Sequence, residues 1–164
     1  MQRLQFWRYE NDDVRALMSV WAHLAQSGLE SAVFDLVCLR VSQLNGCSRC
    51  VEVHERNAIA HGLDRRLLND LAAWRESPVF GGRQRSALAW TEAVTDAADT
   101  RAPDELYREV SSRFSEPELV DLTLAIALMN AFARIAIAFR HGPPPIPAVS
   151  EGAAATSGGL GIDG

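Results

Sequence analysis

Apolar residues recur every three or four positions along most of the chain, which is the spacing that lines one face of an α-helix. No segment alternates apolar and polar residues for long enough to predict a strand. Capping residues, glycines and prolines divide the pattern into successive segments. We therefore expect an all-α fold, a compact multi-helix domain of about seven helices. The predicted helices lie close to residues 12–27, 31–45, 47–61, 64–74, 83–99, 103–114 and 118–140.

Two of these helices are apolar on nearly every side, which predicts that they lie at the centre of the fold. The first covers residues 31–45, and the second covers residues 118–140 and is rich in alanine. The second helix also contains Asn130, a polar residue among apolar ones. Its amide needs hydrogen-bond partners once it is buried. We expect those partners in the loop before residue 47 or in a neighbouring chain.

The composition changes near the end of the chain. Residues 142–164 begin with a glycine and three prolines and continue mainly with glycine, alanine and serine. A segment with so little apolar content cannot bury enough surface to fold. The sequence thus predicts one helical domain over residues 1–141 and a flexible tail over residues 142–164.

The overall composition is ordinary for a soluble globular protein. Of 164 residues, 48% are hydrophobic and 23% are charged, and the net charge is -5. No basic stripe suggests nucleic-acid binding. The longest apolar stretch, residues 122–133, contains Thr123 and Asn130 and is too short and polar to span a bilayer. The first thirteen residues lack a signal-peptide core. We therefore expect a cytoplasmic protein without membrane or nucleic-acid partners.

One short segment carries the candidate chemistry. Residues 42–54 read SQLNGCSRCVEVH, so that an Asn-Gly pair interrupts the helical pattern just before Cys47. At this spacing Cys47, Cys50 and His54 share one face of a helix that begins near the first cysteine. The helix N-terminus stabilises anions, and Arg49 adds positive charge, so both thiols should ionise easily. The pattern indicates a redox-active dithiol with a histidine in reach for proton transfer.

This motif and several other segments of the chain together resemble one known group of proteins. They are residues 35–37 and 39–54 before and through the cysteines, residues 71–78 (LAAWRESP) and residues 114–123 (FSEPELVDLT). Together they resemble the alkylhydroperoxidase D-like (AhpD-like) branch of the carboxymuconolactone decarboxylase-like superfamily. The likeness covers most of residues 15–140, and its most specific part is SQLNGC-x-x-C-x-x-x-H. The resemblance implies an all-helical AhpD-like domain that assembles into homo-oligomers, either trimers or hexamers.

The resemblance also implies an activity and a set of roles. The expected activity is that of a thiol-dependent peroxidase or disulfide reductase, an antioxidant oxidoreductase that uses a hydroperoxide and a dithiol or protein reductant. In the family pattern Cys50 attacks the peroxide, Cys47 resolves the product as a disulfide, and His54 belongs to a proton relay. A glutamate twelve residues before the first cysteine completes that relay. Here the position is Asp35, a possible relay carboxylate that is one methylene shorter. No cofactor and no metal is implied.

Residue chemistry alone favours the same use of the motif. Peroxide reduction needs a thiolate, a proton donor for the departing oxygen and a second thiol. His54 follows Cys50 by four residues and Cys47 by seven, so helical spacing favours Cys50 as the thiol whose proton His54 handles. Cys47 lies within one helical turn of Cys50, as a disulfide requires.

Other interpretations of the same residues remain open. The two close cysteines could be buried structural thiols. A zinc site could use Cys47, Cys50 and His54 with Asp35 or Cys38, although structural zinc sites usually have a second Cys/His pair elsewhere. Asp35 could be a solvated helix charge, and Cys38 could be a small core residue. For function, the alternatives are a carboxymuconolactone decarboxylase-type lactone enzyme, which needs no cysteine pair, and a non-enzymatic redox-sensing oligomer.

Overall fold

The computed structural model describes residues 2–9 and 12–142. These residues form eight α-helices and two 3₁₀ helices, with no strand among them, and the all-α prediction is confirmed. The predicted tail, apart from Gly142, lies outside the described residues. In chain order the elements are η1 (Phe6–Arg8), α1 (Asp12–Leu24), α2 (Ser31–Leu44), α3 (Ser48–Ala60), α4 (Arg65–Asp70), η2 (Leu71–Ala73), α5 (Gly82–Thr95), α6 (Ala97–Thr100), α7 (Asp104–Ser111) and α8 (Glu116–Ala138).

Two of the predicted helices are divided in the structure, and the first division accounts for the eighth α-helix. The helix expected over residues 83–99 is divided at Asp96, whose backbone (φ -107°, ψ 37°) leaves the helical region. The hydrogen-bond ladder of α5 ends there, and the four-residue helix α6 follows. Residues 64–74, expected as one helix, form α4 and then the 3₁₀ turn η2.

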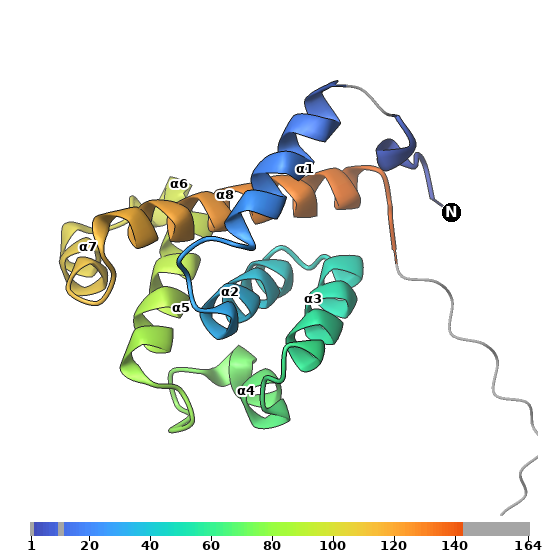
Figure 1. Ribbon diagram of the computed structural model, residues 1–164. Coiled ribbons are helices and arrows are strands. Elements are labelled where there is room, and N and C mark those ends of the chain that lie inside the picture. The colour runs from blue at the N-terminus through green and yellow to red at the C-terminus, as the bar shows by residue number, and fades with distance from the viewer. Residues whose placement is uncertain (1, 10–11, 143–164) are drawn as a thin grey trace, which may run out of the picture.

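Helix α2 occupies the centre of the fold, as its all-round apolar pattern predicts. It packs against α3, α5 and α8, and Figure 1 shows it between the other helices. Three side chains on its core face, those of Val37, Cys38 and Val41, are completely buried. A helix enclosed on this many sides has little freedom to shift, so the residues that follow its C-terminal end are held firmly.

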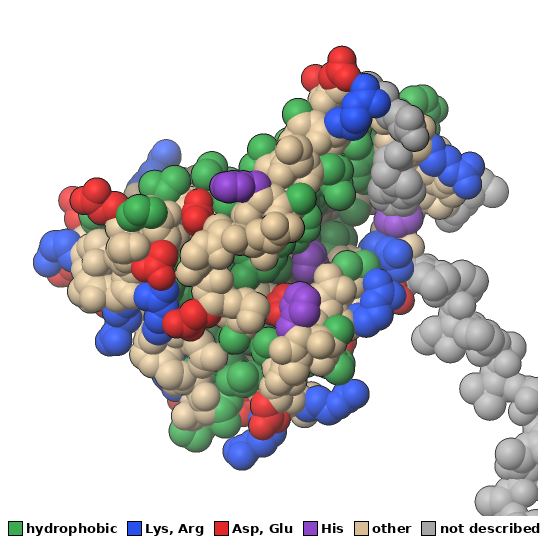
Figure 2. Space-filling view, viewed as in Figure 1, with side chains coloured by type: hydrophobic (Ala, Val, Ile, Leu, Met, Phe, Trp, Pro, Cys, Tyr) green, Lys and Arg blue, Asp and Glu red, His purple; other side chains and the backbone are tan. Residues whose placement is uncertain are grey.

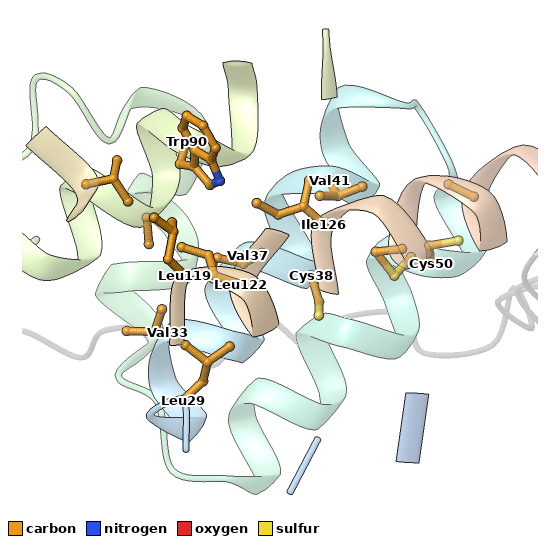
Figure 3. Packing of buried hydrophobic residues seen from close by; sticks show 14 of the residues in the cluster. Leu29, Val33, Val37, Cys38, Val41, Cys50, Trp90, Leu119, Leu122 and Ile126 are labelled. Atoms are coloured by element: carbon orange, nitrogen blue, oxygen red, sulfur yellow. The ribbon is translucent and has the colours of Figure 1, made fainter. Parts of the chain in front are cut away.

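Helix α8 crosses the molecule and supplies much of the core (Figure 1). Figure 3 shows Leu122 and Ile126 near Val37 and Val41 of α2, with Trp90 of α5 close by. By length and composition alone, the 23 residues of α8 are also apolar enough to cross a membrane. This was not predicted from the sequence, because only residues 122–133 were considered there. The inner face of α8 instead packs on α1, α2 and α5, as a core helix does.

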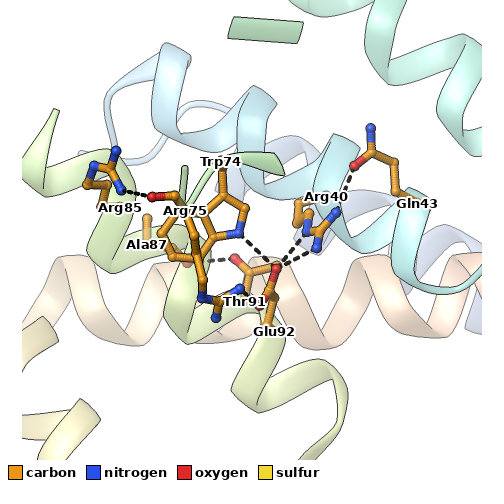
Figure 4. A network of polar contacts seen from close by, with 8 residues as sticks. All are labelled: Arg40, Gln43, Trp74, Arg75, Arg85, Ala87, Thr91 and Glu92. Carbon is orange, nitrogen blue, oxygen red and sulfur yellow. Dashed lines mark hydrogen bonds and ion pairs between the residues drawn. The ribbon is translucent and has the colours of Figure 1, made fainter. Parts of the chain in front are cut away.

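A partly buried carboxylate joins three parts of the fold (Figure 4). Glu92 of α5 accepts hydrogen bonds from Arg40 Nε of α2 at 2.9 Å, from Trp74 Nε1 at 2.8 Å, and from Arg75. Burial alone would raise the pKa of Glu92, but the bonds from Trp74, Arg75 and Arg40 together lower it. The ionised carboxylate therefore fixes α2 against α5 and the segment after η2.

Candidate functional site

The candidate site begins at the turn between α2 and α3. Gly46 has φ +67°, in the left-handed region that glycine adopts without steric cost. The turn is closed by backbone hydrogen bonds from Gly46 N–H to the carbonyl of Gln43 at 3.0 Å and from Cys47 N–H to that of Ser42 at 3.1 Å. Cys47 is consequently the N-cap of α3, as the sequence predicts.

A buried amide on α8 ties this turn to the core. Asn45 Nδ2 donates to Asn130 Oδ1 at 2.8 Å, and Arg134 donates to the same oxygen at 2.8 Å. Asn130 Nδ2 in turn donates to Thr95 Oγ1 at 3.0 Å and to the Ile126 carbonyl at 3.0 Å. The prediction that Asn130 satisfies the loop before the first cysteine is confirmed.

The two sulfurs at the start of α3 are bonded to each other. Cys47 and Cys50 form a disulfide with their Cα atoms 5.3 Å apart, and the Cys50 N–H donates to Cys47 Sγ at 3.3 Å. The residues are 2% and 8% exposed, respectively. The pair is therefore close to the surface but shielded, and it sits where the helix N-terminus favours a thiolate after reduction.

His54 lies one helical turn beyond Cys50 and is only 8% exposed. Its ring meets that of Trp21 from α1 edge to face, with the ring centroids 5.7 Å apart. Burial lowers the pKa of His54 to about 4. At neutral pH the imidazole is uncharged, so one of its ring nitrogens can accept a proton.

Cys50 and His54 face an open cavity of about 370 Å³ between α1, α3 and α8. Figure 2 shows hydrophobic side chains and histidine gathered in the hollow between α1 and α3. Most of the walls are apolar, and Arg49 lies among the polar lining residues. The apolar walls are formed mainly by Phe6, Met18, Trp21, Val53, Met129 and Phe132.

The structure pairs Asp35 with a histidine other than His54. Its side chain is buried, and Asp35 Oδ2 lies 2.7 Å from His61 Nδ1 at the opposite end of α3. No hydrogen bond joins Asp35 to His54 within the described residues. Burial raises the pKa of Asp35 more than the contact with His61 lowers it. The relay role of Asp35 stays a prediction.

Two residues that contact the predicted site residues were not predicted from the sequence. Trp21 was expected only as a core residue of its helix, yet it forms a wall of the cavity against His54. His61 follows His54 by seven residues, so helical spacing could have placed both on one face of α3. That spacing alone did not show that the carboxylate of Asp35 would be its partner.

The third cysteine belongs to the core. Cys38 is completely buried in α2, and burial, followed by the nearby Asp35 carboxylate, raises the pKa of its thiol well above the ordinary value. It therefore stays protonated and inert. Among residues 2–9 and 12–142, no three His, Cys, Asp or Glu side chains are grouped to hold a metal ion.

The fold and the site together define a class of protein. It is an all-helical domain in which a glycine turn leads into a Cys-x-x-Cys pair at a helix start, with a buried histidine one turn later: an AhpD-like dithiol domain. Comparison with known proteins gives the family. Residues 14–93 match the Carboxymuconolactone decarboxylase family, and the chain belongs to that family.

Three relatives illustrate the similarity. The uncharacterized protein YdfG of Bacillus subtilis is 31% identical over 137 residues, which cover 84% of this chain and 93% of YdfG. The solved structure of ATU0492 from Agrobacterium tumefaciens, a protein of unknown function with the suggested name antioxidant defence protein AhpD, superposes with a TM-score of 0.85 at 35% identity, covering 89% of this chain and 100% of ATU0492. Alkyl hydroperoxide reductase AhpD of Rhodococcus erythropolis is 37% identical over 57 residues, 35% of this chain and 31% of that protein.

Proposed function

We propose that this protein is a thiol-dependent peroxidase that reduces organic hydroperoxides through Cys50, Cys47 and His54. The observation that carries the proposal is the bonded cysteine pair beside a buried, neutral histidine, both at the wall of one apolar cavity. A structural disulfide would need neither the histidine nor the cavity. Membership of a family that includes AhpD-type proteins supports the same activity.

The first step is reduction of the peroxide. In the dithiol state, His54 accepts the proton of the Cys50 thiol, because the neutral imidazole lies one turn along α3 and faces the same cavity. The thiolate attacks the terminal peroxide oxygen, an S–O bond forms and the O–O bond breaks. The departing alkoxide takes the proton from His54 and leaves as an alcohol, and Cys50 becomes a sulfenic acid.

The second step closes the disulfide. The Cys47 thiolate attacks the sulfur of the Cys50 sulfenic acid, an S–S bond forms, and hydroxide leaves with a proton as water. The Cα atoms of the two cysteines are 5.3 Å apart, within the range that a disulfide spans without backbone rearrangement. A dithiol or protein reductant then restores both thiols.

The cavity favours hydroperoxides with an apolar organic group. Phe6, Met18, Trp21, Met129 and Phe132 offer aromatic and thioether surface around the sulfur. Burying a hydrocarbon group there gains about 25 cal/mol for each Å² removed from water, whereas hydrogen peroxide gains nothing from these walls. We expect cumene hydroperoxide to be turned over faster than hydrogen peroxide.

Substitution of each cysteine tests the mechanism. Cys50→Ser should abolish turnover of cumene hydroperoxide in the presence of a dithiol reductant. Cys47→Ser should leave a sulfenic acid on Cys50, which dimedone labels and mass spectrometry detects. Cys38→Ala is the matched control, because Cys38 lies in the core and its loss should leave the cysteine chemistry intact. Unchanged turnover in Cys50→Ser would eliminate the proposal.

Thiol alkylation and oxidation separate the two alternatives. A lactone-processing enzyme, which the family's description raises, would act on its substrate after both thiols are alkylated. A redox-sensing oligomer would show negligible peroxide turnover together with a change in mass when Cys47 and Cys50 are oxidised.

A further inference from the structure

The two sulfurs of the disulfide open to different cavities. Cys50 lines the apolar cavity that also contains His54, and Cys47 is absent from its walls. Cys47 lines a second, smaller cavity of about 200 Å³, and Cys50 is absent from that one. The smaller cavity lies between the start of α3 and the end of α8, and its walls include Gly46, Ser48, Ile137, Arg140 and His141.

The smaller cavity is electropositive. No Asp or Glu lines it, and the exposed Arg140 side chain makes no hydrogen bond or ion pair within residues 2–9 and 12–142. Arg49 lines the apolar cavity instead, and its guanidinium is already paired with Glu52 at 2.9 Å. The first turn of α3, with its unpaired backbone N–H groups, begins beside the smaller cavity at Ser48. An anion is therefore favoured more beside Arg140 in the smaller cavity than in the apolar one.

We propose that the reductant reaches the disulfide through this Cys47 cavity and is a thiol that carries a negative charge. The inference rests on the proposed function, because it concerns how the disulfide formed by that reaction is reduced. Cys47 is then the sulfur attacked by the reductant, and Cys50 is the sulfur that leaves.

A thiol RSH reduces the disulfide in two exchange steps. Its thiolate attacks Cys47 Sγ, an R–S–S–Cys47 bond forms, and the Cys47–Cys50 bond breaks with its electron pair on Cys50 Sγ. A second thiolate attacks the reductant's sulfur in the mixed disulfide, so that RSSR departs and Cys47 is released. The protein gains two electrons, the thiol is oxidised, and solvent supplies the protons that the two cysteines bind.

This direction of attack suits the next turnover. The Cys50 thiolate is released on the side of His54 and the apolar cavity, where the hydroperoxide binds. Attack on Cys50 instead would bring an anionic thiol among the mainly apolar walls of the larger cavity, where Arg49 is already paired with Glu52. The two reactants then reach the sulfurs from different cavities, which adjoin at Ala136 and His141.

A charge series of small thiols tests the proposal directly. The oxidised protein is mixed with 3-mercaptopropionate, 2-mercaptoethanol or cysteamine, and loss of the disulfide is followed by quenching and thiol counting. Each per-thiolate rate constant is divided by that of the same thiol with bis(2-hydroxyethyl) disulfide, an uncharged reference, because thiolate nucleophilicity rises with the pKa of the thiol. This ratio should be highest for the anionic thiol and lowest for the cationic thiol, and high salt should reduce the spread because it screens the charges.

Two arginine variants locate the effect. Arg140→Gln should slow 3-mercaptopropionate by about two- to fivefold and leave 2-mercaptoethanol nearly unchanged, the size expected for one exposed charge. Arg56→Gln is the matched control, because Arg56 is exposed on the same helix as the cysteines and lines neither cavity. Its rates should equal those of the unaltered protein.

Peptide mapping identifies the sulfur that is attacked. When exchange is quenched early with iodoacetamide, mercaptopropionate should be found on Cys47 and the carbamidomethyl group on Cys50. Mixed disulfide on Cys50, or equal rate ratios to the uncharged reference disulfide across the series, would overturn the proposal. These measurements use no peroxide, so a protein without peroxidase activity would refute the proposed function and still give a clear result here.

Discussion

The chemistry of His54 depends on its burial. An exposed histidine would be partly protonated at neutral pH, but this ring lies against Trp21 and titrates near pH 4. In the proposed mechanism it therefore acts as a base toward the Cys50 thiol. Burial between the helices, with Trp21 of α1 against the ring, decides the protonation state of this residue on α3.

The depressed pKa of His54 predicts a loss of stability in mild acid. The folded-state pKa, about 4, lies below the unfolded value of 6.5, so the unfolded chain binds the proton more readily. The stability is complete above pH 6.5 and falls as the pH approaches 4, by roughly 3 kcal/mol in total. Urea unfolding of the oxidised protein between pH 4 and pH 7 measures this. His54→Gln should remove this part of the pH dependence, and parallel curves for both proteins would contradict the assignment.

The contact between Asp35 and His61 supports a second prediction. Asp35 is buried, and His61→Ala removes its hydrogen-bond partner, so the variant should lose about 1–3 kcal/mol of unfolding free energy at pH 7. The loss should shrink in acid, where the carboxylate binds a proton. Asp35→Asn combined with His61→Ala should cost less than His61→Ala alone. Equal losses would show that the carboxylate does not depend on the histidine.

The sequence could predict some of these residues and not others, for a geometric reason. The spacing of Cys47, Cys50 and His54 lies within one helix, whose geometry fixes which side chains share a face. The partner of Asp35 depends on how α2 packs on α3, and no local pattern encodes that packing. The carboxylate was therefore expected near His54, whereas the structure pairs it with His61.

The turn between α2 and α3 depends on the backbone conformation of Gly46. Its φ of +67° strains any residue with a Cβ, although a Cβ there would meet no atom within 4 Å. Gly46→Ala should therefore cost about 1 kcal/mol through conformation alone, and Gly46→Asn should cost less. Thermal unfolding checks both. Gly28→Ala is the control, because that site is equally open and has no positive φ, so its stability should change little.

Helix boundaries were predictable where a cap or a glycine marks them. Helix α3 runs Ser48–Ala60 with Cys47 as its N-cap and Gly62 at φ +86° just after its end, close to the expected residues 47–61. The break at Asp96 had no such mark. The apolar pattern continues past it, so the residue pattern alone did not predict that α5 ends there.

At the scale of the whole molecule, the cavities could not be predicted. The larger one draws its walls from η1, α1, α3 and α8, segments that are far apart in the sequence. Each apolar wall residue has the helical spacing of a core residue, and no pattern shows which of them stay partly uncovered. The spacing in the sequence thus predicted that the two cysteines and His54 lie together, and the structure adds the cavity walls beside them.

The outer face of α8 supports the remaining prediction, that the protein is a homo-oligomer. Val120 and Leu124 of α8 and Tyr107 of α7 are 57%, 47% and 49% exposed around a groove of about 450 Å³. Apolar side chains that are exposed together around one groove offer a surface that a partner chain can bury. We propose that a second copy of the chain covers it, in the trimer or hexamer that the family resemblance implies.

Sedimentation equilibrium on micromolar protein tests this proposal. The unaltered chain should have a mass of three or six subunits. Leu124→Glu should raise the dissociation concentration by about tenfold or more, because a charge buried in an apolar contact costs several times the thermal energy. Val20→Glu, at a residue of α1 that is 44% exposed and outside the groove, should leave the mass unchanged. A monomeric mass throughout the concentration range, or full assembly of Leu124→Glu, would contradict the proposal that a second copy covers this face of α8.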